Sequence, residues 1–484
     1  MANSRVLIAG LRGGSGKTIV SLGLIASWRA RGMTVSPFKK GPDFIDAGWL
    51  ALAAGQPCHN LDPFLIPPEK ILSSFVSHHP QAGGVSVIEG NRGLYDGLDV
   101  EGTTSTAELA KLLQAPVVLV VDCTKSTRTM AALISGCIQF DPDVHIAGVI
   151  LNRIAGPRHE SIIKGAVERY CHVPVLGALP KIRQDIFPER HMGLVPTPEH
   201  GWAKDSINKA AEAAEQFLDL EGLTAVAQHV PDLDITGTPT GNETGPSAST
   251  PARSNSGKSK TRFKRPRIGV VRDAAFQFYY PENIEALGQA GAEVVMLSAL
   301  MDQYLDGLDG LYIGGGFPET QAEGLAANEP FRQELCRLAR GGLPVYAECG
   351  GLMYLGEKLV LEGKAYPMVG LLPVVFGFSR RPQGHGYTIC EVEGKNPYFP
   401  TGSRVRGHEF HYSKVLSWKG KPQDLAFRMI RGQGIDQFRD GICYRNTLAT
   451  YTHIHALGTP DWAEALVRVC STWRKRAEQT GQRA

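Results

Sequence analysis

The sequence predicts an α/β protein of two doubly wound domains, the first built on a parallel sheet with a phosphate-binding loop. Three observations predict this fold class. Short apolar runs rich in β-branched residues alternate with longer helical patterns, first up to about residue 220 and again after residue 265. A polar stretch, 236–264, separates the two series. The length of 484 residues also exceeds that of one ordinary domain.

Composition excludes several classes of protein. A net charge of +3 is too small to indicate nucleic acid or a membrane surface as the main partner. No apolar run approaches the roughly 20 residues of a membrane span, and residues 1–5 lead directly into an apolar run instead of a signal peptide. The nine cysteines lack C-x-x-C spacing, which favours reduced thiols. We therefore expect a cytoplasmic protein with small-molecule partners, no nucleic acid and no membrane.

Four apolar runs of the first series predict buried strands. They are VLIAG (6–10), VSVIEG (85–90), APVVLVVD (115–122) and IAGVILNR (146–153). Apolar runs separated by helical patterns are typical of a parallel sheet that helices cover on both faces. The second series begins with RPRIGVVRD, 265–273.

The polar stretch between the two series predicts a flexible, disordered linker. It cannot bury enough apolar surface to offset the entropy lost on ordering. Its end is basic but contains no aromatic interleaving, so we interpret it as a solvated segment and not as a nucleic-acid tail. We place the first domain at 1–228, the linker at 229–265 and the second domain at 266–484.

The segment GLRGGSGKT, 10–18, predicts an ATP site. It follows the first strand and precedes a helical pattern, where backbone N–H groups can converge on phosphates. Lys17 would place its charge on the β- and γ-phosphates, and the Thr18 hydroxyl would bind Mg²⁺. Gly10 stands one residue earlier than the usual spacing, and Arg12 has no evident role. The expected nucleotide-binding residues of the loop are Gly10, Gly13, Gly14, Ser15, Gly16, Lys17 and Thr18.

Acidic residues follow the strands of the same sheet. Glu89 ends one strand, Asp96 and Asp99 follow it in GLYDGLD, and Asp43 and Asp46 lie in KKGPDFID. Open parallel sheets bind ligands at the carboxyl ends of their strands, and carboxylates are the ligands that Mg²⁺ prefers. The pattern therefore predicts a Mg·ATP site.

A second chemical site is expected in the C-terminal series. The segment LPVYAECGGLMYL, 343–355, predicts a strand, a sharp turn with Cys349 and a helix, a geometry that exposes a nucleophile and favours its thiolate. The N–H of Gly350 and the glycine loop YIGGGFPE, through Gly315, would supply donors to an oxyanion.

Both halves resemble one family. KKGPDFID, NLDPFL and IEGNRGLYDG are similar to segments of the cobyrinic acid a,c-diamide synthase family, whose synthetase half is related to dethiobiotin synthetase. Loops of that relative place a glycine as Gly10 is placed. DAAFQFYYPEN, GGGFPE, AECGGLMYL and RGHEFHYS resemble the class I glutamine amidotransferases of corrinoid amidases. The resemblance implies a class I glutaminase-like α/β domain in the C-terminal half.

The resemblance also implies residue roles in the N-terminal half. The residues that would arrange Mg²⁺, ATP and the substrate carboxylate are Asp43, Asp46, Glu89 and Asp96, with Thr18, Asp43 and Glu89 as the Mg²⁺ ligands. Asn152 would lie near the nucleotide base. The chain departs from the family where Phe44 replaces a usual Tyr and where Asp46 precedes AGWL, without the usual Pro and His.

In the C-terminal half, the resemblance favours His453 over His455 as the base. Many class I glutaminases have a Glu two residues after this His, where the present chain has His455, so we expect a Cys–His dyad without a carboxylate. His408 and His411 have H-x-x-H spacing but no third ligand at usable spacing, so we expect a structural or substrate-facing role and not a zinc site.

The implied function is ATP- and glutamine-dependent amidation of the a- and c-acetate carboxylates of cobyrinic acid, through an acyl phosphate, in cobalamin biosynthesis. The same reaction on hydrogenobyrinic acid or nickel-sirohydrochlorin is an alternative, whereas GPDFID and GLYDG disfavour cobyric acid synthase. A more distant alternative is a ParA/MinD-like ATPase, because RGGSGKT resembles its loop with Arg12 in place of the signature Lys. In such loops the Lys reaches the phosphates of a neighbouring subunit, so a homodimer is a further alternative.

Overall fold

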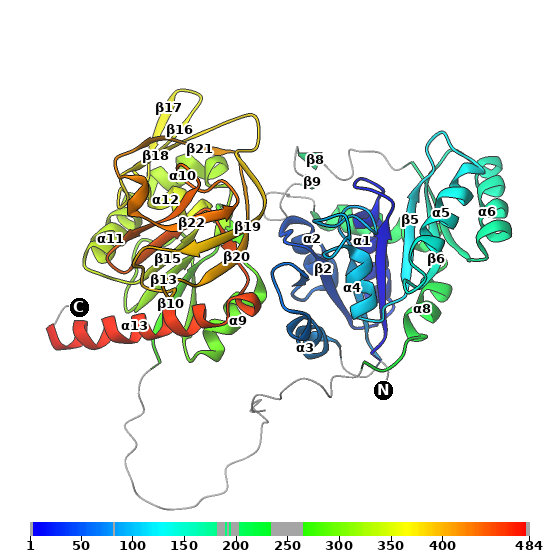
Figure 1. Cartoon of the computed structure of the whole chain (residues 1–484), viewed down its shortest axis with the longest axis horizontal. Coiled ribbons are helices and arrows are strands. Elements are labelled where there is room, and N and C mark those ends of the chain that lie inside the picture. Colours follow the sequence, from blue (N-terminus) through cyan, green and yellow to red (C-terminus); the bar gives the residue numbers. More distant parts are fainter. Residues whose placement is uncertain are drawn as a thin grey trace, which may run out of the picture.

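The structure is a computed structural model that describes residues 3–80, 83–181, 189–190, 193–194, 203–233 and 265–480. It contains two α/β halves that lie side by side (Figure 1), one up to residue 233 and the other from residue 265. Most of the predicted linker, 234–264, lies outside the described residues. The predicted fold class of two α/β units is confirmed. Among the described residues, no helix has the length and apolar character needed to cross a membrane.

The N-terminal half is built on a seven-stranded sheet of order β3-β2-β4-β1-β5-β6-β7, in which every neighbouring pair is parallel. The four predicted strands are β1, β4, β5 and β6. The strands are β1 (Arg5–Gly10), β2 (Val35–Lys40), β3 (His59–Leu61), β4 (Val85–Glu89), β5 (Val117–Asp122), β6 (Ile146–Ile154) and β7 (Val175–Pro180). A separate pair is formed by β8 (Glu189–Arg190) and β9 (Gly193–Leu194).

Helices cover both faces of this sheet, because its strands are apolar on both sides. One face packs against α1 (Lys17–Ala30), α2 (Ile45–Ala54), α7 (Ala203–Phe217) and α8 (Leu220–Gln228). The other face packs against α3 (Pro68–His78), α4 (Thr106–Leu112), α5 (Thr129–Phe140) and α6 (Pro157–Cys171). This arrangement is doubly wound, as the sequence predicts.

The C-terminal half is built on a ten-stranded mixed sheet of order β12-β10-β13-β15-β24-β23-β22-β19-β20-β25. The pairs from β12 to β24 are parallel, and the pairs after β24 are antiparallel. Its strands are β10 (Arg267–Val271), β12 (Glu293–Leu297), β13 (Gly310–Ile313), β15 (Val345–Glu348), β19 (Gly384–Val392), β20 (Arg404–His411), β22 (Leu425–Arg431), β23 (Arg439–Tyr444), β24 (Thr447–Thr450) and β25 (His453–Ile454).

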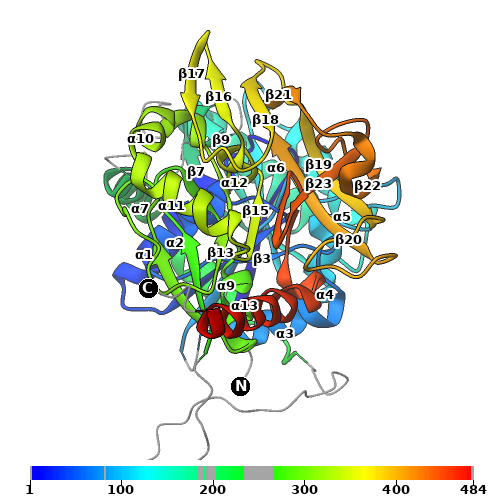
Figure 2. The same ribbon diagram turned by 90° about the vertical axis from the view of Figure 1, so that its left-hand side faces the viewer.

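Smaller elements complete this half. The helices are α9 (Pro281–Gln289), α10 (Ala322–Ala327), α11 (Glu329–Arg340), α12 (Gly350–Leu355) and α13 (Asp461–Thr480). The remaining strands are β11 (Phe276–Phe278), β14 (Gly315–Gly316), β16 (Lys358–Leu361), β17 (Lys364–Pro367), β18 (Val374–Phe378) and β21 (Ser413–Trp418). In Figure 2, α9 and α13 lie along one side of the sheet and α11 and α12 lie on the other.

The two halves contact each other through residues far apart in the sequence. The hydroxyl of Tyr387 donates to Asp62 at 2.7 Å, and the hydroxyl of Tyr280 donates to the carbonyl oxygen of Pro42 at 3.3 Å. The ring of Phe44 stacks on that of Phe278, with 5.1 Å between centroids. The carboxyl ends of β2 and β3 therefore face the C-terminal half.

Candidate active sites

The phosphate loop joins β1 to α1 and contains all seven predicted loop residues, 10 and 13–18. Gly16 has a φ of 98° and lies against Asn152, so that a Cβ at this position would come within 2.2 Å of the amide nitrogen. Only glycine fits there. The amide of Asn152 donates to the carbonyl oxygen of Ser15 at 2.8 Å. Asn152, expected beside the nucleotide base, thus contacts the loop itself.

Lys17 is the first residue of α1, and its ammonium group donates to backbone carbonyl oxygens of two loops. Its Nζ donates to the carbonyl oxygen of Arg92 at 2.8 Å and to that of Arg12 at 3.3 Å. Burial lowers the pKa of Lys17, and the nearby Glu89 carboxylate partly offsets this effect. A phosphate group at the loop would supply the negative charge that this buried ammonium lacks.

Three predicted residues meet around a lysine that sequence reasoning missed. The ammonium of Lys39 donates to Glu89 at 2.8 Å and to Asp46 at 2.9 Å. The Thr18 hydroxyl also donates to Glu89, at 2.8 Å. These side chains come from β2, α2, β4 and α1 and are largely buried. A signal for Lys39 existed, because it lies at the carboxyl end of its strand in the same segment as Asp43 and Asp46.

Adjacent carboxylates in this cluster differ in acidity. Burial and the negative charge of Asp46 raise the pKa of Asp43 to about 7. Burial opposes ionisation of Asp46 as well, but the ion pair with Lys39 lowers its pKa. Asp43 accepts hydrogen bonds from the backbone N–H groups of Ile45 and Asp46 at 2.8 and 3.1 Å.

The donors of this cluster fit a magnesium ion. Oxygen ligands from carboxylates and hydroxyls are what Mg²⁺ requires. One carboxylate oxygen of Glu89, Oε2, is buried without a hydrogen-bond partner, next to the Thr18 hydroxyl on the other oxygen. Asp96 lies outside this cluster. It accepts a hydrogen bond from the N–H of Gly93 at 2.8 Å and lines a cavity between the two halves.

Arg12 pairs with an acid of its own chain. Its side chain is 72% exposed, and its guanidinium lies 3.1 Å from Asp122, to which Arg153 also pairs at 2.7 Å. Burial would raise the pKa of Asp122, but hydrogen bonds from Thr124 and the two guanidinium groups lower it to about 2. The structure thus gives Arg12 a partner at the carboxyl end of β5, beside the phosphate loop.

Cys349 occupies the predicted sharp turn between β15 and α12. Its backbone has a φ of 47° and a ψ of −96°, a conformation that L-residues rarely adopt outside functional turns. Its N–H donates to the carbonyl oxygen of Thr450 at 2.7 Å. A Cβ on Gly350 would lie 3.0 Å from the backbone nitrogen of Gly316, so the elbow and the glycine loop lie close together.

Burial opposes the thiolate form of Cys349. We expected the helix N-terminus to favour the anion, but burial raises the pKa of this thiol well above its usual range. The deprotonated form is destabilised in a buried, water-poor environment. A neighbouring base must therefore take the proton as the nucleophile attacks.

His453 follows β24, the strand parallel to β15, and its ring packs on the glycine loop. A Cβ on Gly315 would come within 2.3 Å of Cε1 of His453, so glycine is required at that position. Nδ1 of His453 lies 3.5 Å from Oε2 of Glu348. A carboxylate therefore lies within ion-pair distance of the predicted base, and the expectation of a Cys–His dyad without one stays a prediction. The carboxylate comes from the residue before the nucleophile, on β15.

Glu348 is itself held in place by two donors. The N–H of Ile454 donates to its Oε1 and the hydroxyl of Tyr312 to its Oε2, both at 3.1 Å. The side chain is buried between β15 and the end of β24. The sequence contained one indication of this residue, because Glu348 directly precedes Cys349. The expectation considered only the position two residues after the histidine and therefore missed it.

The other histidines have different surroundings. His455 is buried against α9, with Nε2 3.6 Å from Glu282. His408 stacks on His453 with 4.8 Å between ring centroids, and burial together with the neighbouring imidazoles lowers its pKa well below the usual range. His411 stacks on Tyr451 at 3.7 Å.

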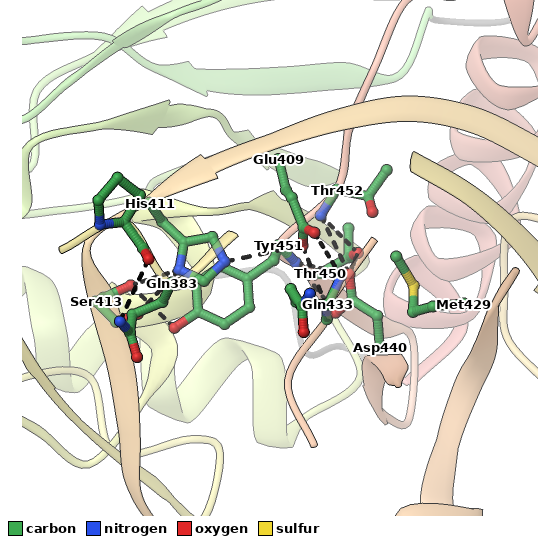
Figure 3. A network of polar contacts seen from close by, with 12 residues as sticks. Gln383, Glu409, His411, Ser413, Met429, Gln433, Asp440, Thr450, Tyr451 and Thr452 are labelled. Atoms are coloured by element: carbon green, nitrogen blue, oxygen red, sulfur yellow. Dashed lines mark hydrogen bonds and ion pairs between the residues drawn. The ribbon is translucent and has the colours of Figure 1, made fainter. Parts of the chain in front are cut away.

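A polar network holds residues 450–452, the segment that precedes His453 in the chain (Figure 3). Asp440 accepts from the Thr450 hydroxyl at 2.6 Å and from the N–H groups of Tyr451 and Thr452 at 3.1 and 3.2 Å. Glu409, labelled in the same view, accepts from the N–H groups of Gln433 and Gly434. The segment from Thr450 to Thr452 leads directly into His453, so Asp440 limits where that ring can lie.

Replacing Glu348 with Gln should lower the rate of glutamine hydrolysis by about 10- to 100-fold, because the neutral amide stabilises an imidazolium less well. Activity with ammonium as the nitrogen source should be unchanged. The measurement is steady-state glutamate formation across pH, with Glu357→Gln, at a partly buried carboxylate that pairs with Lys419, as the matched control. Glutamine hydrolysis at the unaltered rate in Glu348→Gln would contradict a role for this carboxylate.

A cavity of about 370 Å³ lies between the two halves. Asp43, Phe44 and Asp96 line it from the N-terminal half, and His408 and His453 line it from the C-terminal half. The ring of Phe44 lies 5.6 Å from that of His453. The structure thus brings the wall of the predicted ATP site and the predicted glutaminase base to the same cavity.

Comparison with known proteins supports both halves. The CobQ/CobB/MinD/ParA nucleotide binding domain matches residues 6–194, and the CobB/CobQ-like glutamine amidotransferase domain matches residues 267–460. The cobyrinate a,c-diamide synthase of Magnetococcus marinus is 44% identical over 473 residues, 98% of this chain and 97% of that protein. That of Archaeoglobus fulgidus is 41% identical over 466 residues, 96% of this chain and 97% of that protein. Because these similarities span nearly the whole chain, the chain belongs to the cobyrinate a,c-diamide synthase family.

Proposed function

We propose that this chain converts the a- and c-acetate carboxylates of cobyrinic acid to amides, with ATP and glutamine as co-substrates. Members of its family with this name align over almost its full length. The observation that carries the proposal is the shared cavity, which acidic residues of the ATP half and His453 of the glutaminase half both line. The partitioning-ATPase alternative has no use for the amidotransferase domain that matches residues 267–460.

In the glutaminase half, Sγ of Cys349 attacks the side-chain amide carbon of glutamine while His453 removes the thiol proton. Glu348 stabilises the resulting imidazolium, and the N–H groups of Gly315 and Gly350 bind the oxyanion. His453 then protonates the leaving amine, so ammonia departs and a glutamyl thioester remains. Water hydrolyses the thioester to glutamate and restores the thiol.

In the ATP half, the carboxylate of the substrate attacks the γ-phosphorus of ATP. The acyl phosphate forms as ADP departs, and Lys17 stabilises the charge on the transferring phosphoryl group. When bound, Mg²⁺ would be held by Thr18, Asp43 and Glu89 and would neutralise phosphate charge. Ammonia then displaces phosphate from the acyl carbon and forms the amide.

The cavity wall suits a substrate with many carboxylates. Lys40 and Arg92 from one half and Arg431 from the other line it, together with the aromatic rings of Phe44 and Tyr387. Cations pair with acetate and propionate groups, and rings pack on an extended macrocycle. Because acids of the ATP half and the glutaminase base line the same cavity, we infer that ammonia passes through this space from one site to the other.

We also propose that the two domains extend over residues 1–228 and 266–484.

Incubation with Mg·ATP and glutamine should give stepwise amidation of cobyrinic acid, detected as two successive losses of one mass unit by mass spectrometry. The tetrapyrrole identity is tested by competition among cobyrinic acid, hydrogenobyrinic acid and nickel-sirohydrochlorin in one reaction. Amidation of cobyrinic acid first supports the proposal. Preferential amidation of either competitor would replace the substrate and leave the chemistry unchanged, whereas amidation of none would overturn the proposal.

A further inference from the structure

Two histidines of the N-terminal half and one glutamate of the C-terminal half converge outside the lining of the shared cavity. Nε2 of His59, in β3, lies 3.1 Å from Oε1 of Glu285, in α9. Nε2 of His78, the last residue of α3, lies 3.3 Å from Oε2 of the same carboxylate. The two imidazoles stack with 3.5 Å between their centroids and 17° between their planes. Within the part of the chain that the structure describes, the ligand atoms of these three side chains all lie within 4.8 Å of one another, close enough to hold a metal ion.

The hydrogen bonding of His78 leaves its Nε2 in need of a positive partner. Nδ1 of His78 lies 2.8 Å from the carbonyl oxygen of Ser74, one turn earlier in α3, so the ring proton is on Nδ1. In the neutral ring, Nε2 then presents a lone pair to the Glu285 carboxylate, which is unfavourable. The carboxylate can be satisfied in two ways, by a proton on Nε2 of His78 or by a metal ion shared among the three side chains.

A divalent metal ion satisfies all three groups together. Tetrahedral zinc with bonds of about 2.0–2.1 Å places neighbouring ligand atoms roughly 3.3 Å apart. The separations of 3.1 and 3.3 Å between Glu285 and the two imidazoles are on this scale, and the stacked rings must rotate so that both Nε2 lone pairs point to one ion. The Nδ1–H bond to Ser74 is the outer contact that metal-bound histidines usually make. The side chain of His78 is 24% exposed and that of Glu285 is 37% exposed, so an ion can enter and a water molecule can be the fourth ligand.

We propose that His59, His78 and Glu285 bind a zinc-type divalent ion that ties the N-terminal half to the C-terminal half. Two imidazoles and one carboxylate are a donor set that suits zinc over magnesium or calcium, which prefer all-oxygen sites. The tie acts next to the shared cavity, because α9 begins directly after Tyr280, whose hydroxyl contacts Pro42 on the cavity wall. The inference is independent of the tetrapyrrole identity.

The test uses the full-length chain, freed of metal by a chelator and kept in excess Mg²⁺ so that the ATP site is not free for the probe. Co²⁺ is titrated as the spectroscopic probe and is then displaced with Zn²⁺. We expect one ion per chain, visible d–d absorption of a four-coordinate site and no sulfur-to-cobalt charge-transfer band. Zinc should also raise the thermal midpoint of the wild-type chain, because it binds only the folded state.

Variants assign the ion to these residues. Glu285→Gln and His78→Gln should weaken binding by more than the roughly 10- to 100-fold that loss of an outer contact costs. His145→Gln, at an exposed histidine elsewhere, is the matched control and should bind as wild type. His59→Gln changes a buried ligand and can fail to fold. Glu285 is partly exposed, so Glu285→Gln keeps the proposal testable in that case.

Three outcomes would overturn the proposal. Absence of Co²⁺ and Zn²⁺ binding to the wild-type chain would do so, as would equal binding to the wild type and to both ligand variants. A thermal midpoint that responds to pH through His78 but not to zinc would show that a proton and not a metal ion holds the three side chains together.

Discussion

Replacing Cys349 with Ala should abolish glutamine-dependent amidation, by at least about 10⁴-fold, because no other group can form the thioester. Amidation with added ammonium should persist, since the ATP half activates the carboxylate without the thiol. The reason is spatial as well as chemical. The thiol lies in the C-terminal half at the elbow between β15 and α12, whereas Lys17 and its cluster lie at the strand ends of the other sheet. The measurement compares amide formation by mass spectrometry with each nitrogen source.

The matched control is Cys336→Ala, on α11, which removes a partly buried thiol that takes no part in the proposed reaction. It should use glutamine as the wild type does. A Cys349→Ala variant that is inactive with ammonium as well as glutamine, while still folded by circular dichroism, would refute separate catalytic halves. Full glutamine use by that variant would refute the nucleophile assignment.

The glutaminase elbow illustrates what a sequence can predict and what it cannot. Cys349 and the glycine loop could be identified because a sharp turn between strand and helix has a local signature. Glu348 could not be assigned, because its role depends on β15 and β24 being neighbours and on His453 lying beyond the end of β24. Strand order is not encoded locally, so a motif search at the position two residues after the histidine cannot find a carboxylate that a neighbouring strand brings close.

The N-terminal sheet was predictable for a similar reason, and the interface was not. Runs such as 117–121 are apolar on both faces and so identify buried parallel strands. The contact of Phe44 with Phe278 joins residues more than 200 positions apart, and no periodicity reports such a pairing. Lys39 was missed because a buried lysine is recognisable only once Asp46 and Glu89 are seen to surround it.

Replacing Lys17 with Ala should remove amidation with both nitrogen sources, by at least about 100-fold. The loss of one preorganised positive group from a phosphoryl-transfer site costs on this scale. Lys17 is buried, and its ammonium already lies at the mouth of the phosphate loop on the carbonyl oxygens of Arg12 and Arg92. Because burial lowers its pKa in the absence of phosphate, the bound nucleotide should raise the pKa by supplying the missing counter-charge.

This asymmetry separates the two halves experimentally. Lys17→Ala should still hydrolyse glutamine, since Cys349, His453 and Glu348 are untouched, whereas Cys349→Ala should still form amide from ammonium. Lys164→Ala, at an exposed lysine on α6, is the matched control and should retain both activities. Amidation by Lys17→Ala at the wild-type rate would mean that another cation stabilises the phosphoryl group. Lys39 would be the first to test, because it is a buried ammonium at the same sheet edge, between Asp46 and Glu89.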